Sequence, residues 1–292
     1  MTGNFKRISD FWTDFSANKI ALISLLIFFA IVFVAVFAPI VSPTNPYDLS
    51  SVDIMDSRLP PGSTNYSGQI FLLGTDGAGR DMLSSIFYGL RVSLGVGALS
   101  GVIALTIGSF FGVSAAFFRG KYETIVMRIV DIQLSFPSIL VALIIIAAFG
   151  KGIEKTMIAL ILVQWAYYAR TARASALVEM NKEYIDAARC LAFGNTRIMF
   201  KHILPNCLAP LIVVGTLQTA HAISLEATLS FLGLGLPVTE PSLGLLIGNG
   251  FEYMYSGDFW ISIFPGVALL ITVGSINLVG DHLRDMFNPR LH

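Results

Sequence analysis

The chain has 292 residues, of which 54% are hydrophobic and only 13% are charged, and its mean hydropathy is +0.72. A soluble globular domain carries about 25% charged residues, so this composition excludes an ordinary soluble domain and favours a membrane protein. The net charge of zero gives no overall field for nucleic acid, and Cys190 and Cys207 have no partners at zinc-site spacing, so we expect no metal site.

The first apolar block runs from about Ile20 to Val41. A cleaved signal peptide is the competing interpretation, but the apolar core of a signal peptide is only about 7–15 residues long. This block is longer, and Asp10 and Asp14 crowd the region before it. We therefore predict a cytoplasmic segment at 1–19 and a retained first transmembrane helix at 20–41.

A polar segment at 42–91 follows, and we expect an external loop and an interfacial segment there because its prolines break any helix in its first part. Five further apolar blocks lie within residues 92–280. Each can cross about 30 Å of hydrocarbon, although the fourth block is short and has to extend past Arg170. The sequence therefore predicts an all-α polytopic membrane protein with six transmembrane helices. The five blocks are 92–118, 129–149, 156–168, 207–227 and 259–280.

Basic residues indicate the orientation, because they accumulate on the cytoplasmic side of a membrane. If the N-terminus is cytoplasmic, the inside segments hold 14 basic residues and the outside segments hold 5. We therefore expect both ends, including a tail at 281–292, to be cytoplasmic. The inside residues are Lys6, Arg7, Lys19, Arg119, Lys121, Arg128, Arg170, Arg173, Lys182, Arg189, Arg197, Lys201, Arg284 and Arg290; the outside residues are Arg58, Arg80, Arg91, Lys151 and Lys155.

The second predicted helix carries a stripe of glycines at Gly97, Gly101, Gly108 and Gly112. Their spacing keeps them on one helical face. Small residues let two helix backbones approach closely in a bilayer, so we predict helix packing, either inside the subunit or against a partner. Lining of a pore is the alternative interpretation.

The longest predicted cytoplasmic segment contains a loop at 174–206 that reads as helix, turn, helix. Tyr184, Ala187, Ala188 and Leu191 share one helical face. Two interpretations stay open: an amphipathic hairpin that lies on lipid, or a compact knob that docks into a groove on a cytoplasmic partner. Docking would place Ala187 and Ala188 against the partner, so a tryptophan at position 188 should block the contact. We expect Asn181 to cap the first helix, Gly194 to permit the reversal, and Asn195 to cap the second helix.

This loop resembles the cytoplasmic loop of binding-protein-dependent ABC importer permeases, whose pattern is Glu-Ala-Ala, three residues, Gly and a downstream Leu-Pro. Asp186 stands at the position of the glutamate, before the two alanines, and Leu204 and Pro205 stand at the end. Ala192 replaces the glycine of the family, and Gly194 follows two residues later. The resemblance identifies an ATPase-coupling loop, with Glu183, Tyr184, Asp186, Ala187, Ala188, Arg189, Leu191 and Gly194 as its candidate residues.

The resemblance covers nearly the whole chain and is specific to the second permease subunit of the peptide and nickel group. Residues 73–81 are similar to its Gly-Thr-Asp and Gly-Arg-Asp signature, and 127–137 to its third-helix motif. Residues 231–235 match an external motif, and 277–290 resemble the carboxy-terminal signature.

The resemblance implies a type I ABC importer permease fold in a bacterial inner membrane, surrounded by membrane lipid. It also implies a heterodimer with a paralogous permease subunit, two cytoplasmic ATPase subunits that bind ATP and Mg, and an extracytoplasmic solute-binding protein. The implied cargo is dipeptides or oligopeptides, and nickel, glutathione or another small solute is the alternative. We expect this chain to bind no cofactor and no nucleic acid itself and to contain no catalytic residues.

Polar residues within the predicted helices are functional candidates, because their burial in a membrane is costly. Gln218, His221 and Glu226 recur near one side of the fifth helix, where they line a substrate path or bond to neighbouring helices. Asp131 is expected to form a structural pair with Arg128. The rival from another class is a stand-alone secondary transporter, which predicts an inverted repeat that the sequence does not show.

Overall fold

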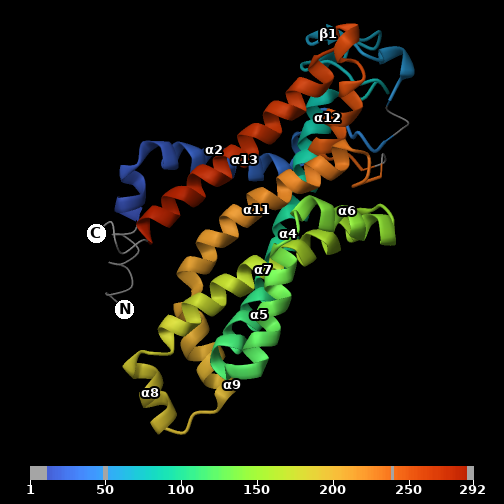
Figure 1. Ribbon diagram of the computed structural model, residues 1–292. Helices are drawn as coiled ribbons and strands as arrows, with labels where there is room; N and C mark the ends of the chain where they lie inside the picture. The colour runs from blue at the N-terminus through green and yellow to red at the C-terminus, as the bar shows by residue number, and fades with distance from the viewer. Residues whose placement is uncertain (1–11, 49–51, 238–239, 288–292) are drawn as a thin grey trace.

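The computed structural model describes residues 12–48, 52–237 and 240–287 and is mainly helical (Figure 1). Lys6, Arg7, Arg290 and the end of the predicted carboxy-terminal signature lie outside the described residues. The only strands in the described part form one antiparallel hairpin. The elements are α2 (Lys19–Val36), α3 (Ala38–Val41), η2 (Ile54–Asp56), β1 (Ser63–Thr64), β2 (Ile70–Phe71), α4 (Met82–Phe118), α5 (Gly120–Leu134), α6 (Ser138–Phe149), α7 (Ile153–Glu179), α8 (Glu183–Cys190), α9 (Asn195–Arg197), η3 (Ile198–Ile203), α10 (Leu204–Asn206), α11 (Leu208–Phe231), α12 (Leu243–Phe251), η4 (Met254–Ser256) and α13 (Trp260–Met286).

Among the described residues, the helices α2, α4, α11 and α13 are long and apolar enough to cross a membrane, and the bent pair α5–α6 adds a fifth span if it counts as one. Helix α7 has 27 residues but does not reach the same apolar composition, because Lys155, Arg170 and Arg173 lie within it. The predicted fold class is correct, and the predicted number of six spans is approximate.

Helix α4 begins ten residues before the predicted block, at Met82 rather than at residue 92. The carboxylate of Asp81 accepts a hydrogen bond from the backbone N–H of Ser84 at 2.8 Å and so caps the helix. Met82 and Ile86 are buried in a cluster with Trp260, the first residue of α13. Residues 82–91 therefore belong to the same continuous helix as the predicted second span.

The predicted span at 129–149 is two helices, α5 and α6, which meet at an angle of 92°. Pro137 stands directly before α6, and it has no N–H to continue the hydrogen bonding of α5. Helix α5 begins earlier than predicted, at Gly120, because Arg119 and Gly120 both adopt positive φ angles and reverse the chain directly after α4.

The glycine stripe of α4 packs against two helices of the same chain. A side-chain carbon at Gly108 would lie 2.4 Å from the carbonyl oxygen of Trp165, and one at Gly112 would lie 2.3 Å from that of Ala169, both on α7. At Gly97 the same carbon would lie 2.6 Å from Ile223 of α11, whereas Gly101 has ordinary contacts with α11. The backbones of α4 and α7 are therefore in direct contact.

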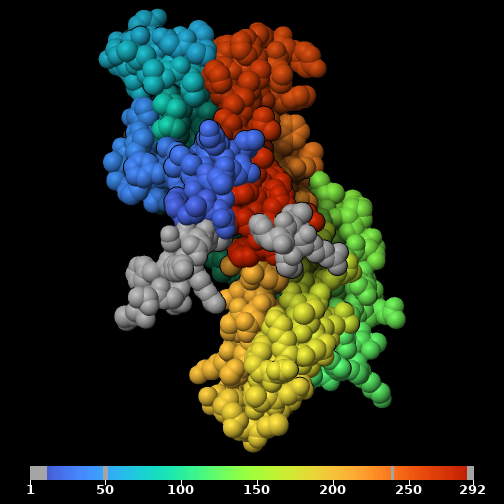
Figure 2. Space-filling view, turned by 90° about the vertical axis from the view of Figure 1, so that its left-hand side faces the viewer, coloured from blue at the N-terminus to red at the C-terminus, as the bar shows by residue number. Residues whose placement is uncertain are grey.

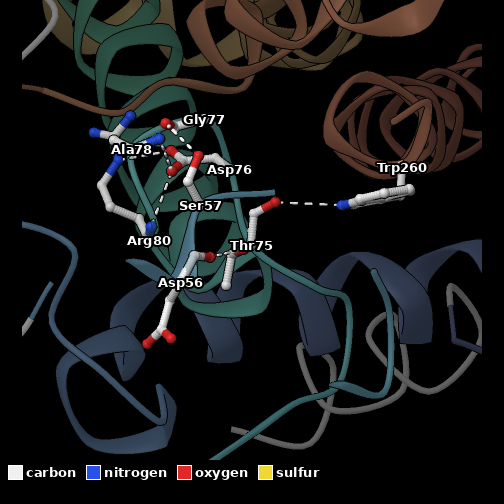
Figure 3. Close-up of polar contacts among 8 residues, drawn as sticks. All are labelled: Asp56, Ser57, Thr75, Asp76, Gly77, Ala78, Arg80 and Trp260. Carbon is white, nitrogen blue, oxygen red and sulfur yellow. Dashed lines mark hydrogen bonds and ion pairs between the residues drawn. The ribbon is translucent and has the colours of Figure 1, made fainter. Parts of the chain in front are cut away.

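Residues 52–81, which we call the polar cap, fold into a compact structure at the end of the molecule opposite to α8 (Figure 1). Its centre is the predicted signature segment (Figure 3). The carboxylate of Asp76 accepts hydrogen bonds from the backbone N–H of Arg80 at 2.9 Å and from its Nε at 2.7 Å. The hydroxyl of Thr75 donates to the carbonyl of Asp56, and Nε1 of Trp260 donates to the carbonyl of Thr75 at 3.3 Å. The cap is thereby attached to the start of α13.

Candidate functional site

The α8 hairpin, which we define as residues 180–206, forms the tip of the molecule at the end away from the polar cap (Figures 1 and 2). Ile185 and Ala188 are buried in one cluster with Met180, Ile198 and Ile203. This cluster continues into α4, α7 and α11, so the core of the hairpin is continuous with the core of the helix bundle.

The two alanines at the centre of α8 lie on different sides of the helix. Ala188 is 3% exposed and faces the interior of the hairpin, whereas Ala187 is exposed at the surface. The prediction of one shared docking face is therefore wrong for Ala188, which faces inward. The other members of that face are Tyr184, Ala187 and Leu191. A helix turns by about 100° per residue, and the buried pair Ile185 and Ala188, three residues apart, determines which side faces inward. A bulky side chain at Ala188 would therefore disturb the packing inside the hairpin before it could affect a contact with a partner protein.

The exposed surface of the hairpin carries both charges and apolar groups. Leu191 is 67% exposed and is an apolar side chain at this surface. Arg189 pairs with Asp186 at 3.3 Å, and both side chains are largely exposed. The remaining exposed candidates are Glu183, Tyr184, Ala187 and Gly194.

The start of α8 and the turn after it differ from the prediction at three residues. The left-handed conformation belongs to Ala192, with a φ of 54°, whereas Gly194 has a φ of −62°. Asn181 donates to the carbonyl of Leu177 and does not cap α8, and the side chain of Asn195 makes no capping bond to α9. Ala192 thus adopts the left-handed conformation that favours a glycine. For an alanine this conformation costs about 1–2 kcal/mol of conformational energy.

A polar network fastens α8 to the rest of the chain. Glu179, the last residue of α7, accepts hydrogen bonds from Nζ of Lys182 at 2.6 Å and from the hydroxyl of Tyr184 at 2.7 Å. Nδ2 of Asn206 donates to the same hydroxyl at 3.2 Å. Sequence reasoning missed Glu179, Lys182 and Asn206, because no pattern in the chain links them to Tyr184.

The environment of this network shifts two pKa values. Burial alone would raise the pKa of Glu179, but the hydrogen bonds from Lys182 and Tyr184 lower it below its ordinary value. Burial and the hydrogen bond to Glu179 raise the pKa of Tyr184, so its hydroxyl stays protonated. Because the pKa of Glu179 is lowered by folding, the network stabilises the hairpin at neutral pH and loses this stabilisation as the pH falls through the lowered value.

Two ion pairs connect α5 to α7 near the hairpin. Asp131 pairs with Arg170 at 2.6 Å and not with the predicted Arg128. Glu123 pairs with Arg173 at 2.5 Å. Arg128 lies three residues before Asp131 on the same helix, but the partner on α7 is the one that the packing of the two helices brings within reach.

The three candidates on α11 have different surroundings. Glu226 is fully buried, and its carboxylate accepts hydrogen bonds from Ser93 of α4 at 2.8 Å and from Ser230 at 2.7 Å. Ser93 in turn accepts a hydrogen bond from the N–H of Leu243, so Glu226 joins α4, α11 and α12. These bonds agree with the helix-bonding alternative, and the role of Glu226 in a substrate path stays a prediction.

Gln218 and His221 lie closer to the surface of α11. His221 is exposed, and Gln218 is half-buried, with an Oε1 that has no hydrogen-bond partner among the described residues. Both remain candidates for a path that is completed by a partner subunit. Within the described ranges, no three His, Cys, Asp or Glu side chains lie together as a metal site.

The comparison with known families decides the identity. Residues 104–292, which include the α8 hairpin, match the family described as binding-protein-dependent transport system inner membrane component. The chain belongs to this family. Residues 6–61 also match the N-terminal transmembrane domain of oligopeptide transport permease C. The family supplies a multi-pass membrane permease and not a catalytic subunit, and membership implies ATPase and substrate-binding partners in general.

Other members of this family resemble the chain over almost its whole length. The di/tripeptide transport system permease protein DppC of Pseudomonas aeruginosa is 41% identical over 97% of this chain and 92% of its own length. The dipeptide transport system permease protein DppC of Escherichia coli is 41% identical over 97% of this chain and 93% of its own length. Inward-facing structures of the MetNI methionine ABC transporter cover 71% of this chain at 23% identity, with TM-scores of 0.56 and 0.57, and show the fold.

Proposed function

We propose that the chain is one of two related permease subunits of an ATP-driven importer and forms half of the translocation path for dipeptides or oligopeptides. The supporting observation is the 41% identity to two peptide permeases over 97% of the chain. Because this identity extends across the helices and the α8 hairpin together, the similarity concerns the whole permease chain and not one motif.

In this proposal, the exposed part of the α8 hairpin binds one of two cytoplasmic ATPase subunits, which hold ATP and Mg. Closure of the ATPase pair moves α8, and the helices continuous with it change the access of the path from one side to the other. A solute-binding protein delivers the peptide at the end with the polar cap. The permease itself performs no covalent step.

The orientation belongs to the same proposal, with the α8 hairpin inside and the polar cap outside a bacterial inner membrane. The supporting observation is the excess of basic residues in the segments on the hairpin side. In a cysteine-free background, a cysteine at Ser63 of the cap should react with a membrane-impermeant thiol reagent in intact cells, whereas one at Asn195 should react only after permeabilisation. The reverse pattern would contradict the orientation.

Deletion of the gene tests the cargo. In a strain without other peptide importers, the deletion should abolish growth on a dipeptide as the source of a required amino acid and should confer resistance to a toxic dipeptide analogue. The intact gene should restore both properties. Unchanged peptide uptake together with a loss of nickel uptake would refute the peptide assignment.

A further inference from the structure

The hydroxyl of Tyr184 is the point where the two arms of the α8 hairpin meet. Towards the first arm, it donates to Glu179, the last residue of α7, at 2.7 Å. From the second arm, it accepts a hydrogen bond from Asn206, the last residue of α10, at 3.2 Å. Asn206 lies two residues before the start of α11, so one phenol on α8 is bonded to the ends of two long helices.

The acceptor in this contact is a buried carboxylate. Glu179 is 8% exposed, and its other oxygen accepts a hydrogen bond from Lys182. A hydrogen bond to a charged group contributes more than one between neutral groups, and a buried carboxylate that loses a donor is costly. Asn206 is held in place by a second hydrogen bond, from its Nδ2 to the carbonyl of His202 at 2.7 Å. Both partners of the Tyr184 hydroxyl, the acceptor Glu179 and the donor Asn206, are therefore each held by a further hydrogen bond.

The apolar contacts of α8 lie beside this contact. Ile185 and Ala188 pack into the hairpin core and hold α8 against it, but apolar contacts are not directional. A directed hydrogen bond has a narrow range of distance and angle, so it fixes the position of α8 along its own axis.

We propose that the Tyr184 hydroxyl and the Glu179 carboxylate form a positioning clasp that makes α8, α7 and α11 move together when the ATPases pull or push on α8. This inference rests on the proposed function and deepens it, because it assigns to two residues the transmission of movement and not the binding of the ATPase. Without the clasp, the ATPases still move α8, but α7 and α11 follow this movement only in part.

Replacement of Tyr184 by phenylalanine tests the clasp, because it removes the hydroxyl and keeps the ring. We expect the solute transported per ATP hydrolysed by the assembled complex to fall about ten-fold, the value expected for the loss of a hydrogen bond to a charged group. The assay uses the full complex in proteoliposomes with its binding protein.

Tyr122→Phe is the matched control. Tyr122 is 38% exposed against 36% for Tyr184, and its hydroxyl also makes a side-chain hydrogen bond, to Ser114 at 2.9 Å. It lies on α5, and its hydroxyl is bonded to α4 and not to Glu179 or Asn206, so transport per ATP should stay at the wild-type value. An equal loss in both variants would show a general effect of a missing hydroxyl and overturn the proposal.

Two changes at Glu179 separate the hydrogen bond from general structure. Glu179→Gln keeps an acceptor for Tyr184 and should retain most of the transport per ATP. Glu179→Leu removes the acceptor and should lower transport per ATP as much as Tyr184→Phe does. The double variant with both Glu179→Leu and Tyr184→Phe should show little further loss. Loss of ATPase binding in Tyr184→Phe, or unchanged transport per ATP in it, would overturn the clasp. If the wild-type complex itself fails to transport peptides, the proposed function is wrong and not the clasp alone.

Discussion

Leucine at Gly108 or Gly112 should prevent the protein from folding in the membrane. A side-chain carbon at either position would lie within 2.4 Å of a backbone carbonyl oxygen of α7, and a backbone atom can yield only if the two helices separate. Overpacking of this kind costs about 3 kcal/mol at each site, a large part of the stability of a typical domain. The yield of monodisperse protein in detergent and its melting temperature measure the effect.

Gly95→Leu provides the control for this prediction, because Gly95 lies on the same helix and nothing lies within 4 Å of its side-chain position. It should give wild-type yield. Normal yield and melting temperature of the Gly108 and Gly112 variants would mean that α4 and α7 do not approach each other as closely as the structure has them.

Ala187→Trp should abolish transport by removing the ATPase subunits from an otherwise folded permease. Ala187 is exposed on α8, so the indole has room in the isolated chain but fills the space that a docked partner needs. We expect ATPase binding to weaken by roughly ten- to a hundred-fold, which corresponds to the usual cost of overpacking an interface. Co-purification of the ATPases with the tagged permease, at matched expression, measures this.

Ala187→Ser is the small control and should recruit ATPases normally. Ala188→Trp should behave differently from Ala187→Trp, because residue 188 is 3% exposed inside the hairpin and the indole would disrupt the fold of the hairpin and lower the yield. If Ala187→Trp recruits its ATPases fully, or if it inserts into lipid and improves membrane binding, the hairpin is an interfacial element and not a docking site.

Hydropathy and motif alone were sufficient for the fold class, for the approximate positions of most spans and for the location of the hairpin. These features depend on long apolar runs and on local order in the chain, both of which are visible in a sequence. The angle between α5 and α6 was not predictable in the same way. The run at 129–149 ends in a long apolar stretch, and Pro137, which breaks it among several polar residues, is also tolerated as a kink within a transmembrane helix.

The details of the site depended on contacts between distant segments. The inward side of α8 is set by its packing on η3, and the role of Tyr184 depends on Asn206, twenty-two residues further along the chain. The burial of Glu226 likewise requires Ser93, which is 133 residues away. The left-handed position at Ala192 has one signal in the sequence, the glycine that the family pattern has there, but the chain also offers Gly194 for the turn and does not show which residue makes it.

The length of α4 gives the subunit a mechanical property. Its 37 residues form one uninterrupted rod of about 55 Å, which runs from the foot of the polar cap to the level of the hairpin core. Its lower half lies in backbone contact with α7, so a tilt of one of these helices would have to carry the other with it. For a rigid rod of this length, a tilt of about 5° at the lower end would displace the upper end by about 5 Å, comparable to one turn of a helix. A small movement near the hairpin core would therefore become a larger one at the polar cap.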